Sequence, residues 1–256
     1  MPTLVFDLDG TLVDSAQDLA AAASELVEGF GGPPLDVATV VPMVGDGAPM
    51  LVQRALTHAG LDPKTPAALD RFLAIYDRRL LDHTRPYAGI PEVLAMLVHL
   101  GPLAVLTNKP TRATETLLEA LGLRGFFSAV IGGDTPHGRK PAPAGLRSLL
   151  ARTDGAGVMI GDSPADARTA EAAPCPFILA GWGFGVVKFG VDAVDGTEVP
   201  SLRTVTPAGT ESHGSGRTER RDFSPVVTRV ATHPRELVSL VETLTLDAAR
   251  MPIVMR

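Results

Sequence analysis

Cysteine and the larger aromatic residues are scarce in this chain. Its 256 residues include one cysteine, one tryptophan and two tyrosines. Cys175 stands between Pro174 and Pro176, with neither a second thiol nor a histidine beside it. An internal disulfide is therefore excluded, and a thiolate zinc site is not indicated. This usage is typical of a reducing compartment, and we expect a cytoplasmic protein.

Positive charge and long apolar runs are also lacking. The net charge is -6 and the isoelectric point is near 5.5, and lysine and arginine are scattered along the chain. No general field attracts a polyanion, so we expect no nucleic-acid partner. No window approaches the roughly 20 apolar residues of a membrane-spanning helix, and no signal-like segment is present. We expect no membrane partner, and either a monomer or a homodimer.

The chain does have an alternation of short apolar runs and helix-like patterns. The runs lie at residues 3–6, 103–106, 129–131, 158–160 and 177–179. Helix-like patterns separate them after the first hundred residues, which is typical of parallel strands joined by crossover helices. Because the runs do not alternate with polar residues, both faces of each strand should be covered. We predict an α/β fold with a doubly wound parallel sheet and a Rossmann-like core.

Residues 15–85 interrupt this alternation with four helix-like segments and no good strand. We predict an inserted helical cap over these residues, and an α/β catalytic core made of residues 1–14 and 86–256. A helical module held above a sheet suggests a lid over a site. A subdomain with no part in the site is the alternative interpretation.

The stretch LVFDLDGTLVDS at residues 4–15 places Asp7 and Asp9 just past the first strand. Ligands bind at the carboxyl ends of the strands in open parallel sheets. An extended backbone would put both carboxylates on the same side, where a hard dication such as Mg²⁺ would relieve their repulsion. Gly10 permits a close backbone approach, and Thr11 offers a hydroxyl and an amide to an anion. A simple turn at Asp9-Gly10 is the alternative.

Polar residues also follow the later strands of the predicted sheet: Thr107 and Asn108, then Lys140, then Asp162, Ser163 and Asp166. A hydroxyl and a carboxamide after the second strand could hold phosphoryl oxygens, or could merely begin a helix. An exposed, solvated charge is the alternative for Lys140. A helix capping box explains Ser163 and Asp166 but leaves the carboxylate of Asp162 without a structural reason.

In this order the residues resemble the haloacid dehalogenase superfamily of phosphohydrolases. The matching parts are D-x-D-G-T at 7–11, Thr107, Lys140 and G-D-S-x-x-D at 161–166, and the insert looks like that superfamily's mobile cap. The resemblance implies that Asp7 attacks phosphorus and forms an aspartyl-phosphate, and that Asp9 is the general acid and base. It further implies that Thr107 and Lys140 stabilise the transferring group.

The same resemblance implies a bound Mg²⁺. Asp7, the backbone carbonyl of Asp9 and Asp162 would hold the ion. Asp166, with Ser163 beside it, would support the site by orienting Lys140 or a metal-bound water.

A closer likeness is to phosphoglycolate phosphatases, carried by VGDGAPMLVQRAL at 44–56, LTNKP at 106–110 and GGDTPHGRKPAP at 132–143. It implies a Mg²⁺-dependent phosphomonoester hydrolase that converts 2-phosphoglycolate to glycolate and phosphate. The alternatives are a phosphatase or phosphomutase for another small phosphorylated metabolite, such as a sugar phosphate, and, more distantly, a non-catalytic receiver-type phosphoacceptor domain. The implied substrate-binding residues are Gly10, Thr11 and Asn108 in the core and Gly45, Asp46, Gly47 and Ala48 in the cap.

One segment departs from the family pattern. Residues 188–225 are rich in glycine, serine, threonine and arginine and poor in large apolar side chains. Such a composition buries too little surface to offset the entropy lost on ordering. We expect an extra, mobile segment within the core here.

Overall fold

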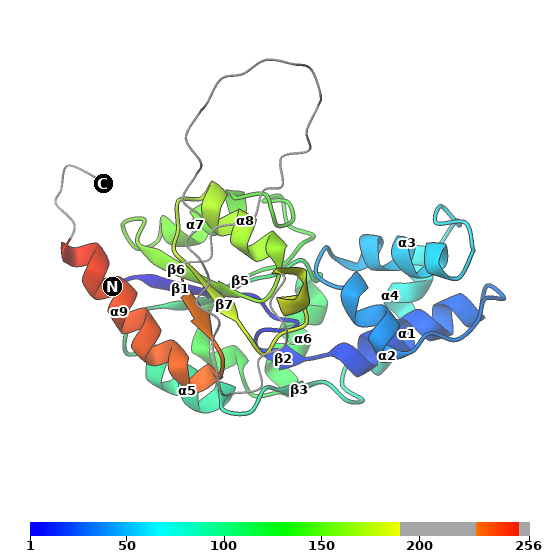
Figure 1. Cartoon of the computed structure of the whole chain (residues 1–256), viewed down its shortest axis with the longest axis horizontal. Coiled ribbons are helices and arrows are strands. Elements are labelled where there is room, and N and C mark those ends of the chain that lie inside the picture. Colours follow the sequence, from blue (N-terminus) through cyan, green and yellow to red (C-terminus); the bar gives the residue numbers. More distant parts are fainter. Residues whose placement is uncertain (190–228, 251–256) are drawn as a thin grey trace, which may run out of the picture.

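The computed structural model describes residues 1–189 and 229–250, which form a sheet-based core and a helical cap beside it (Figure 1). Almost all of the segment predicted to be mobile, 188–225, lies outside the described residues, so that expectation stays a prediction. None of the described helices has both the length and the apolar character needed to cross a bilayer.

The core is built on a six-stranded parallel sheet with the order β5-β4-β1-β6-β7-β8. The strands are β1 (Thr3–Phe6), β4 (Leu103–Leu106), β5 (Phe127–Ile131), β6 (Gly157–Gly161), β7 (Phe177–Ala180) and β8 (Arg229–Ala231). Chain order reverses direction on either side of β1, between β4 and β6. In a doubly wound sheet that reversal opens a crevice at the carboxyl ends of the strands.

Helices cover both faces of this sheet, as the sequence predicts. They are α5 (Ile90–Leu97), α6 (Thr111–Ala120), α7 (Ala144–Leu150), α8 (Pro164–Ala172) and α9 (Leu237–Arg250), with short 3-10 turns η2 (Arg124–Phe126), η3 (Val186–Phe189) and η4 (Pro234–Glu236). In Figure 1, α7 and α8 lie on one side of the sheet and α5 and α9 on the other. Leu4 and Phe6 pack into one apolar cluster and Val5 into a second, and all three are fully buried. Burial on both faces explains the unbroken apolar run of β1.

The cap is inserted between two short strands. Its elements are α1 (Ala16–Glu28), α2 (Val37–Val40), η1 (Val41–Met43), α3 (Ala48–His58) and α4 (Ala68–Arg79). Phe72, Ile75 and Tyr76 form the buried face of α4, and the rings of Phe72 and Tyr76 stack with centroids 5.9 Å apart. The apolar period along α4 therefore buries one face, as an amphipathic helix does.

The chain leaves and re-enters the core at one place. The outgoing strand β2 (Val13–Asp14) pairs antiparallel with the returning strand β3 (Arg85–Pro86). Beside this ladder, the fully buried carboxylate of Asp18 accepts hydrogen bonds from the backbone amides of His83, at 2.9 Å, and Thr84, at 2.8 Å. The hydroxyl of Thr84 donates to the same carboxylate at 2.6 Å. The first helix of the cap thus fastens the segment that returns to the core.

Candidate active site

Asp7 follows β1 at the point where the chain order of the sheet reverses. Its buried Oδ1 lies 2.7 Å from Nζ of Lys140, yet it accepts no hydrogen bond of good geometry. Burial raises the pKa of Asp7 to about 6, because the opposing charge of Lys140 offsets that effect only in part. A buried carboxylate oxygen that is paired by charge alone can still accept a further ligand.

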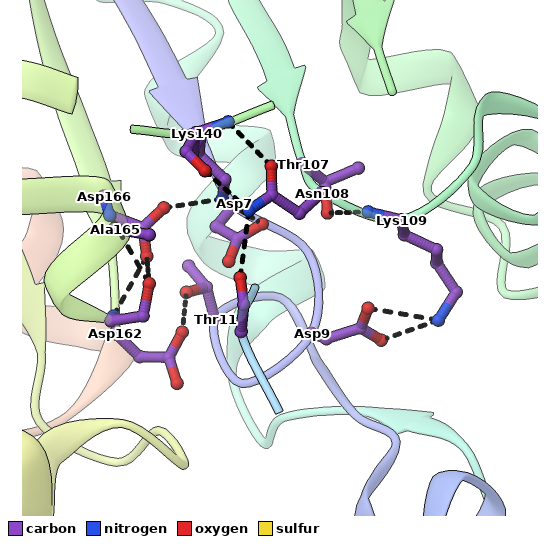
Figure 2. Close-up of polar contacts among 12 residues, drawn as sticks. Asp7, Asp9, Thr11, Thr107, Asn108, Lys109, Lys140, Asp162, Ala165 and Asp166 are labelled. Carbon is purple, nitrogen blue, oxygen red and sulfur yellow. Dashed lines mark hydrogen bonds and ion pairs between the residues drawn. The ribbon is translucent and has the colours of Figure 1, made fainter. Parts of the chain in front are cut away.

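Three buried carboxylates meet at this point (Figure 2). Oxygens of Asp7, of Asp162 after β6 and of Asp166 in the first turn of α8 all lie within 4.8 Å of one another. Burial, together with the charges of Asp7 and Asp166, raises the pKa of Asp162 to about 8. The ammonium of Lys140 pairs with two of the three acids, Asp7 and Asp166. This oxygen-only set, with the unsatisfied Oδ1 of Asp7, fits a hard divalent cation such as Mg²⁺.

Lys140 is held inside the cluster rather than in solvent. Its side chain is 1% exposed, and Nζ lies 2.5 Å from Oδ1 of Asp166. Burial alone would lower the pKa of this amine, but the charges of Asp166 and Asp7 outweigh burial and raise it above its usual range. The alternative of an exposed, solvated lysine is therefore wrong, because the side chain is buried. The two carboxylates offset the cost of burying its charge.

Asn108 positions the loop that carries Lys140. The Asn108 carboxamide accepts from the Lys140 backbone amide at 2.7 Å and donates to the Lys140 carbonyl at 3.0 Å. The neighbouring Thr107 is buried at the end of β4, and its hydroxyl accepts from the backbone amide of Lys109 at 3.3 Å. Sequence order alone could not show that Asn108 bridges the loops after β4 and β5.

The backbone around Asp162 requires glycine. Gly10 has φ of 85°, and a Cβ there would lie 2.3 Å from Oδ2 of Asp162. The hydroxyl of Thr11 donates to Oδ1 of Asp162 at 3.3 Å. Ser163 forms the predicted capping box with Asp166, whose Oδ2 accepts from the Ser163 amide at 2.9 Å. The capping explanation is thus correct for this pair, and Asp166 also faces Lys140.

Asp9 belongs to a different ion pair. Its carboxylate lies 3.0 Å and 3.1 Å from Nζ of Lys109, and the hydroxyl of Ser15 donates to it at 2.6 Å. Figure 2 shows Asp9 turned toward Lys109 and away from Asp162. The positive charge beside the Asp9 carboxylate is therefore the ammonium of Lys109, whereas the Asp7 carboxylate faces Lys140. The expectation that the carboxylates of Asp7 and Asp9 lie on the same side stays a prediction.

A cavity of about 210 Å³ lies between the core and the cap. Asp7, Asp9, Thr107 and Asn108 line it from the core, and the predicted cap residues Gly45, Gly47 and Ala48 line it from the other side. Asp46 is not part of the lining, because its carboxylate pairs with Arg54 at 2.5 Å. Nδ2 of Asn108 donates to the Gly45 carbonyl at 3.0 Å, and Nζ of Lys188 donates to the Val44 carbonyl at 2.7 Å. These two bonds hold the cap loop against the core.

Comparison with known proteins agrees with this geometry. A family model described as haloacid dehalogenase-like hydrolase matches residues 4–180. The chain belongs to this family. Phosphoglycolate phosphatase from Chromobacterium violaceum is 42% identical over 189 residues, which cover 71% of this chain and 85% of that protein. Phosphoglycolate phosphatase from Rhodospirillum rubrum is 43% identical over 195 residues, which cover 71% and 80%.

Solved structures show the same likeness. The crystal structure of a predicted phosphoglycolate phosphatase from Haemophilus somnus superposes with a TM-score of 0.67 at 29% identity, and the match covers 73% of this hydrolase and 88% of that chain. A haloacid dehalogenase-like family protein from Streptococcus pneumoniae covers 94% of this chain with a TM-score of 0.67. At 18% identity, the second comparison shows the fold alone.

Several residues of the hydrolase's site were not singled out from the sequence. The backbone amide of Gly185 donates to Oδ2 of Asp162 at 2.9 Å, and a Cβ on Gly183 would lie 2.2 Å from Cβ of Asp162. The spacing G-W-G-F-G directly after the fifth strand was the available signal. Lys109 and Tyr76 also line the cavity. Lys109 stood in the LTNKP stretch, but Tyr76 was visible only as one apolar position of a helix.

Proposed function

We propose that this hydrolase is a Mg²⁺-dependent phosphatase that converts 2-phosphoglycolate to glycolate and phosphate. The observation that carries the proposal is the buried group of Asp7, Asp162 and Asp166 around Lys140, with Asp7 opening into the cavity under the cap. The curated relatives at 42% and 43% identity, both phosphoglycolate phosphatases, support the choice of substrate.

Each side chain has a role that follows from its position. Asp7 attacks phosphorus and forms an aspartyl-phosphate, which divides one slow displacement into two faster ones. Lys140 and Thr107 bind the oxygens of the transferring group. Asp9 lines the cavity. In its protonated form it delivers the proton to the leaving oxygen, and as the resulting carboxylate it takes a proton from the attacking water, which restores the acid.

Asp7, Asp162 and the backbone carbonyl of Asp9 would hold Mg²⁺, and Asp166 would hold Lys140 in place. When bound, the ion would neutralise the acidic cluster and the phosphoryl oxygens, so that the anionic substrate is not repelled. Gly45, Gly47 and Ala48 exclude bulk water above the reacting group.

The size of the cavity favours a small leaving group. Its volume of about 210 Å³ is below the roughly 300 to 1,000 Å³ that is usual for drug-sized ligands. Glycolate is a two-carbon leaving group, whereas a sugar is much larger. We further propose that the enzyme acts in the cytoplasm, as a monomer or a homodimer.

A panel of phosphomonoesters tests the proposed function. With Mg²⁺, kcat/KM should be highest for 2-phosphoglycolate when it is compared with sugar phosphates, pyrophosphate and flavin mononucleotide, and EDTA should abolish turnover. Asp7→Asn should abolish hydrolysis of every ester while the protein still unfolds cooperatively with heat. A higher kcat/KM for a sugar phosphate would overturn the substrate, and full activity of Asp7→Asn would overturn the mechanism.

A further inference from the structure

Lys109 is a buried cation that the phosphoryl-transfer steps do not use. It follows β4, and its side chain is 4% exposed. Its amine lies between Asp9 of the core and Tyr76 of the cap helix α4. The amine pairs with the Asp9 carboxylate at 3.0 Å, and an amine buried this deeply stays charged when a carboxylate pairs with it. Lys109 is therefore a charged ammonium within the cavity.

Tyr76 adds a second polar group beside this ammonium. Nζ of Lys109 donates to the Tyr76 hydroxyl at 2.6 Å and lies 4.5 Å from the centre of its ring. Burial raises the pKa of Tyr76 to about 12, so the hydroxyl keeps its proton. Among the described residues, no acceptor receives that proton. The hydroxyl can therefore donate to a molecule in the cavity that it lines.

The rest of the lining shows where a second anion would bind. Two of the lining residues are cationic, Lys109 and Arg112. The side chain of Arg112 is 86% exposed and lies 3.7 Å from Asp77. The cap contributes mainly apolar side chains to the cavity, among them Leu51, Phe72 and Leu73. An anion that enters this space leaves water and needs a buried partner. Lys109 supplies that partner.

The position of Lys109 suits a carboxylate on the leaving group. Asp9, which would protonate the leaving oxygen, is 3.0 Å from Nζ of Lys109 (Figure 2). In 2-phosphoglycolate, one methylene carbon separates the ester oxygen from the carboxylate. With the ester oxygen at Asp9, the carboxylate is therefore within reach of the ammonium next to Asp9.

Building on the proposed function, we propose that Lys109 and Tyr76 form a second anion subsite, which receives the carboxylate of the leaving group. Lys109 supplies the charge, and the Tyr76 hydroxyl donates the second hydrogen bond. Because Tyr76 belongs to the cap and Lys109 to the core, the subsite is complete only when the cap lies against the core. The enzyme would thereby select small phosphomonoesters that carry a carboxylate next to the ester.

The test compares two substrates of nearly the same shape, 2-phosphoglycolate and its neutral amide, phosphoglycolamide. Wild-type kcat/KM should be about 10- to 100-fold higher for the acid, the range expected for a charge-assisted hydrogen bond. Lys109→Met should remove most of this preference by lowering kcat/KM for the acid far more than for the amide. Tyr76→Phe, which keeps the ring, should reduce the preference severalfold.

Two further variants separate this subsite from general charge effects. Lys64→Met removes an exposed lysine of the cap and should leave the preference unchanged. Arg112→Met tests the other cation of the lining. If Arg112→Met removes the preference and Lys109→Met does not, the assignment to Lys109 is overturned.

The outcomes distinguish the subsite from the proposed function. If wild type hydrolyses both substrates equally well, the inference is overturned while the phosphatase activity stands. If Lys109→Met lowers kcat/KM for both by the same factor, Lys109 only positions Asp9 and the subsite is overturned. If wild type hydrolyses neither, the proposed function and the inference fail together. Should Lys109→Met not fold, the wild-type ratio and Tyr76→Phe decide the question.

Discussion

The ionisation of Asp162 depends strongly on its surroundings. Its pKa is raised to about 8 from the model-compound value of 3.8, chiefly by burial and then by the charges of Asp7 and Asp166. In metal-free protein, the folded state therefore keeps this proton between about pH 4 and pH 8, where the unfolded chain has lost it. The free energy of unfolding should fall as pH rises through that window.

Mg²⁺ should reverse this trend, because it binds the deprotonated carboxylates. We expect the ion to raise the melting temperature more at about pH 8.5 than at about pH 6, as measured by calorimetry with Mg²⁺ and with EDTA. In Asp162→Asn, the rise in melting temperature caused by Mg²⁺ should be nearly the same at the two pH values. An equal rise of melting temperature at both in wild type would contradict a cation bound at this cluster.

Single residues also show which parts of the site could be predicted from the sequence. Asp7, Lys140 and Asp162 were predictable as neighbours, because parallel strands bring their carboxyl ends to one edge of a sheet. The direction of a loop side chain depends on partners that are distant in sequence. Asp46 was expected to contribute to substrate binding, but its carboxylate pairs with Arg54. The amine of Lys109 lies at the cavity because it donates hydrogen bonds to Asp9 and Tyr76.

Among the elements, the two-strand crossing between core and cap depends on Asp18. Asp18→Ala would leave the buried amide of Thr84, its hydroxyl and the amide of His83 without an acceptor. We expect the free energy of unfolding to fall by about 2 to 4 kcal/mol, since buried unsatisfied donors cost about 1 to 3 kcal/mol each and some would recover water. Denaturant titration measures this. Asp70→Ala, at an exposed acid in the first turn of α4, should cost less than about 1 kcal/mol, and equal losses would contradict the special role of Asp18.

The elements differ in how well the sequence predicts them. Five core strands were predicted because each contains a continuous apolar run. Every residue of β1, β4 and β7 is buried, whereas Ser128 of β5 is exposed. β8 was missed, since its three residues Arg-Val-Ala contain no such run. The strands β2 and β3 are two residues each, too short to show any periodicity. Their pairing is set by the packing of the cap on the core, which local sequence does not encode.

For the whole molecule, the shape of the cavity depends on how the cap is held against the core. Nζ of Lys188 in the core donates to the carbonyl of Val44 in the cap. Lys188→Met removes this bond, whose partly exposed setting limits it to roughly 1 kcal/mol. We therefore expect about fivefold faster amide hydrogen exchange over residues 43–48, with exchange in α1 unchanged. Lys64→Met should change neither region, and unchanged exchange over 43–48 in Lys188→Met would contradict this contact as a fastening of the cap.

The architecture of the whole molecule was largely predictable, and the contacts across its cavity were not. Strand and helix order define a doubly wound sheet, and a helical insert directly after the first motif predicts a cap. Which cap side chains face the core depends on how the surfaces of cap and core pack against each other. Ala48 and Tyr76 both line the cavity, but only Ala48 stood in a recognisable motif.

The paired crossing of β2 and β3 has an evolutionary consequence. Because Val13 pairs with Pro86, the two ends of the insert are neighbours in space, and a different helical cassette could be grafted there without stretching the scaffold. Tyr76 would be exchanged with the cap, whereas Lys109 would stay with the core. Exchanging caps between relatives would therefore change the size of substrate that the cavity accepts, while the core that keeps Lys109 would still favour substrates with a second negative charge.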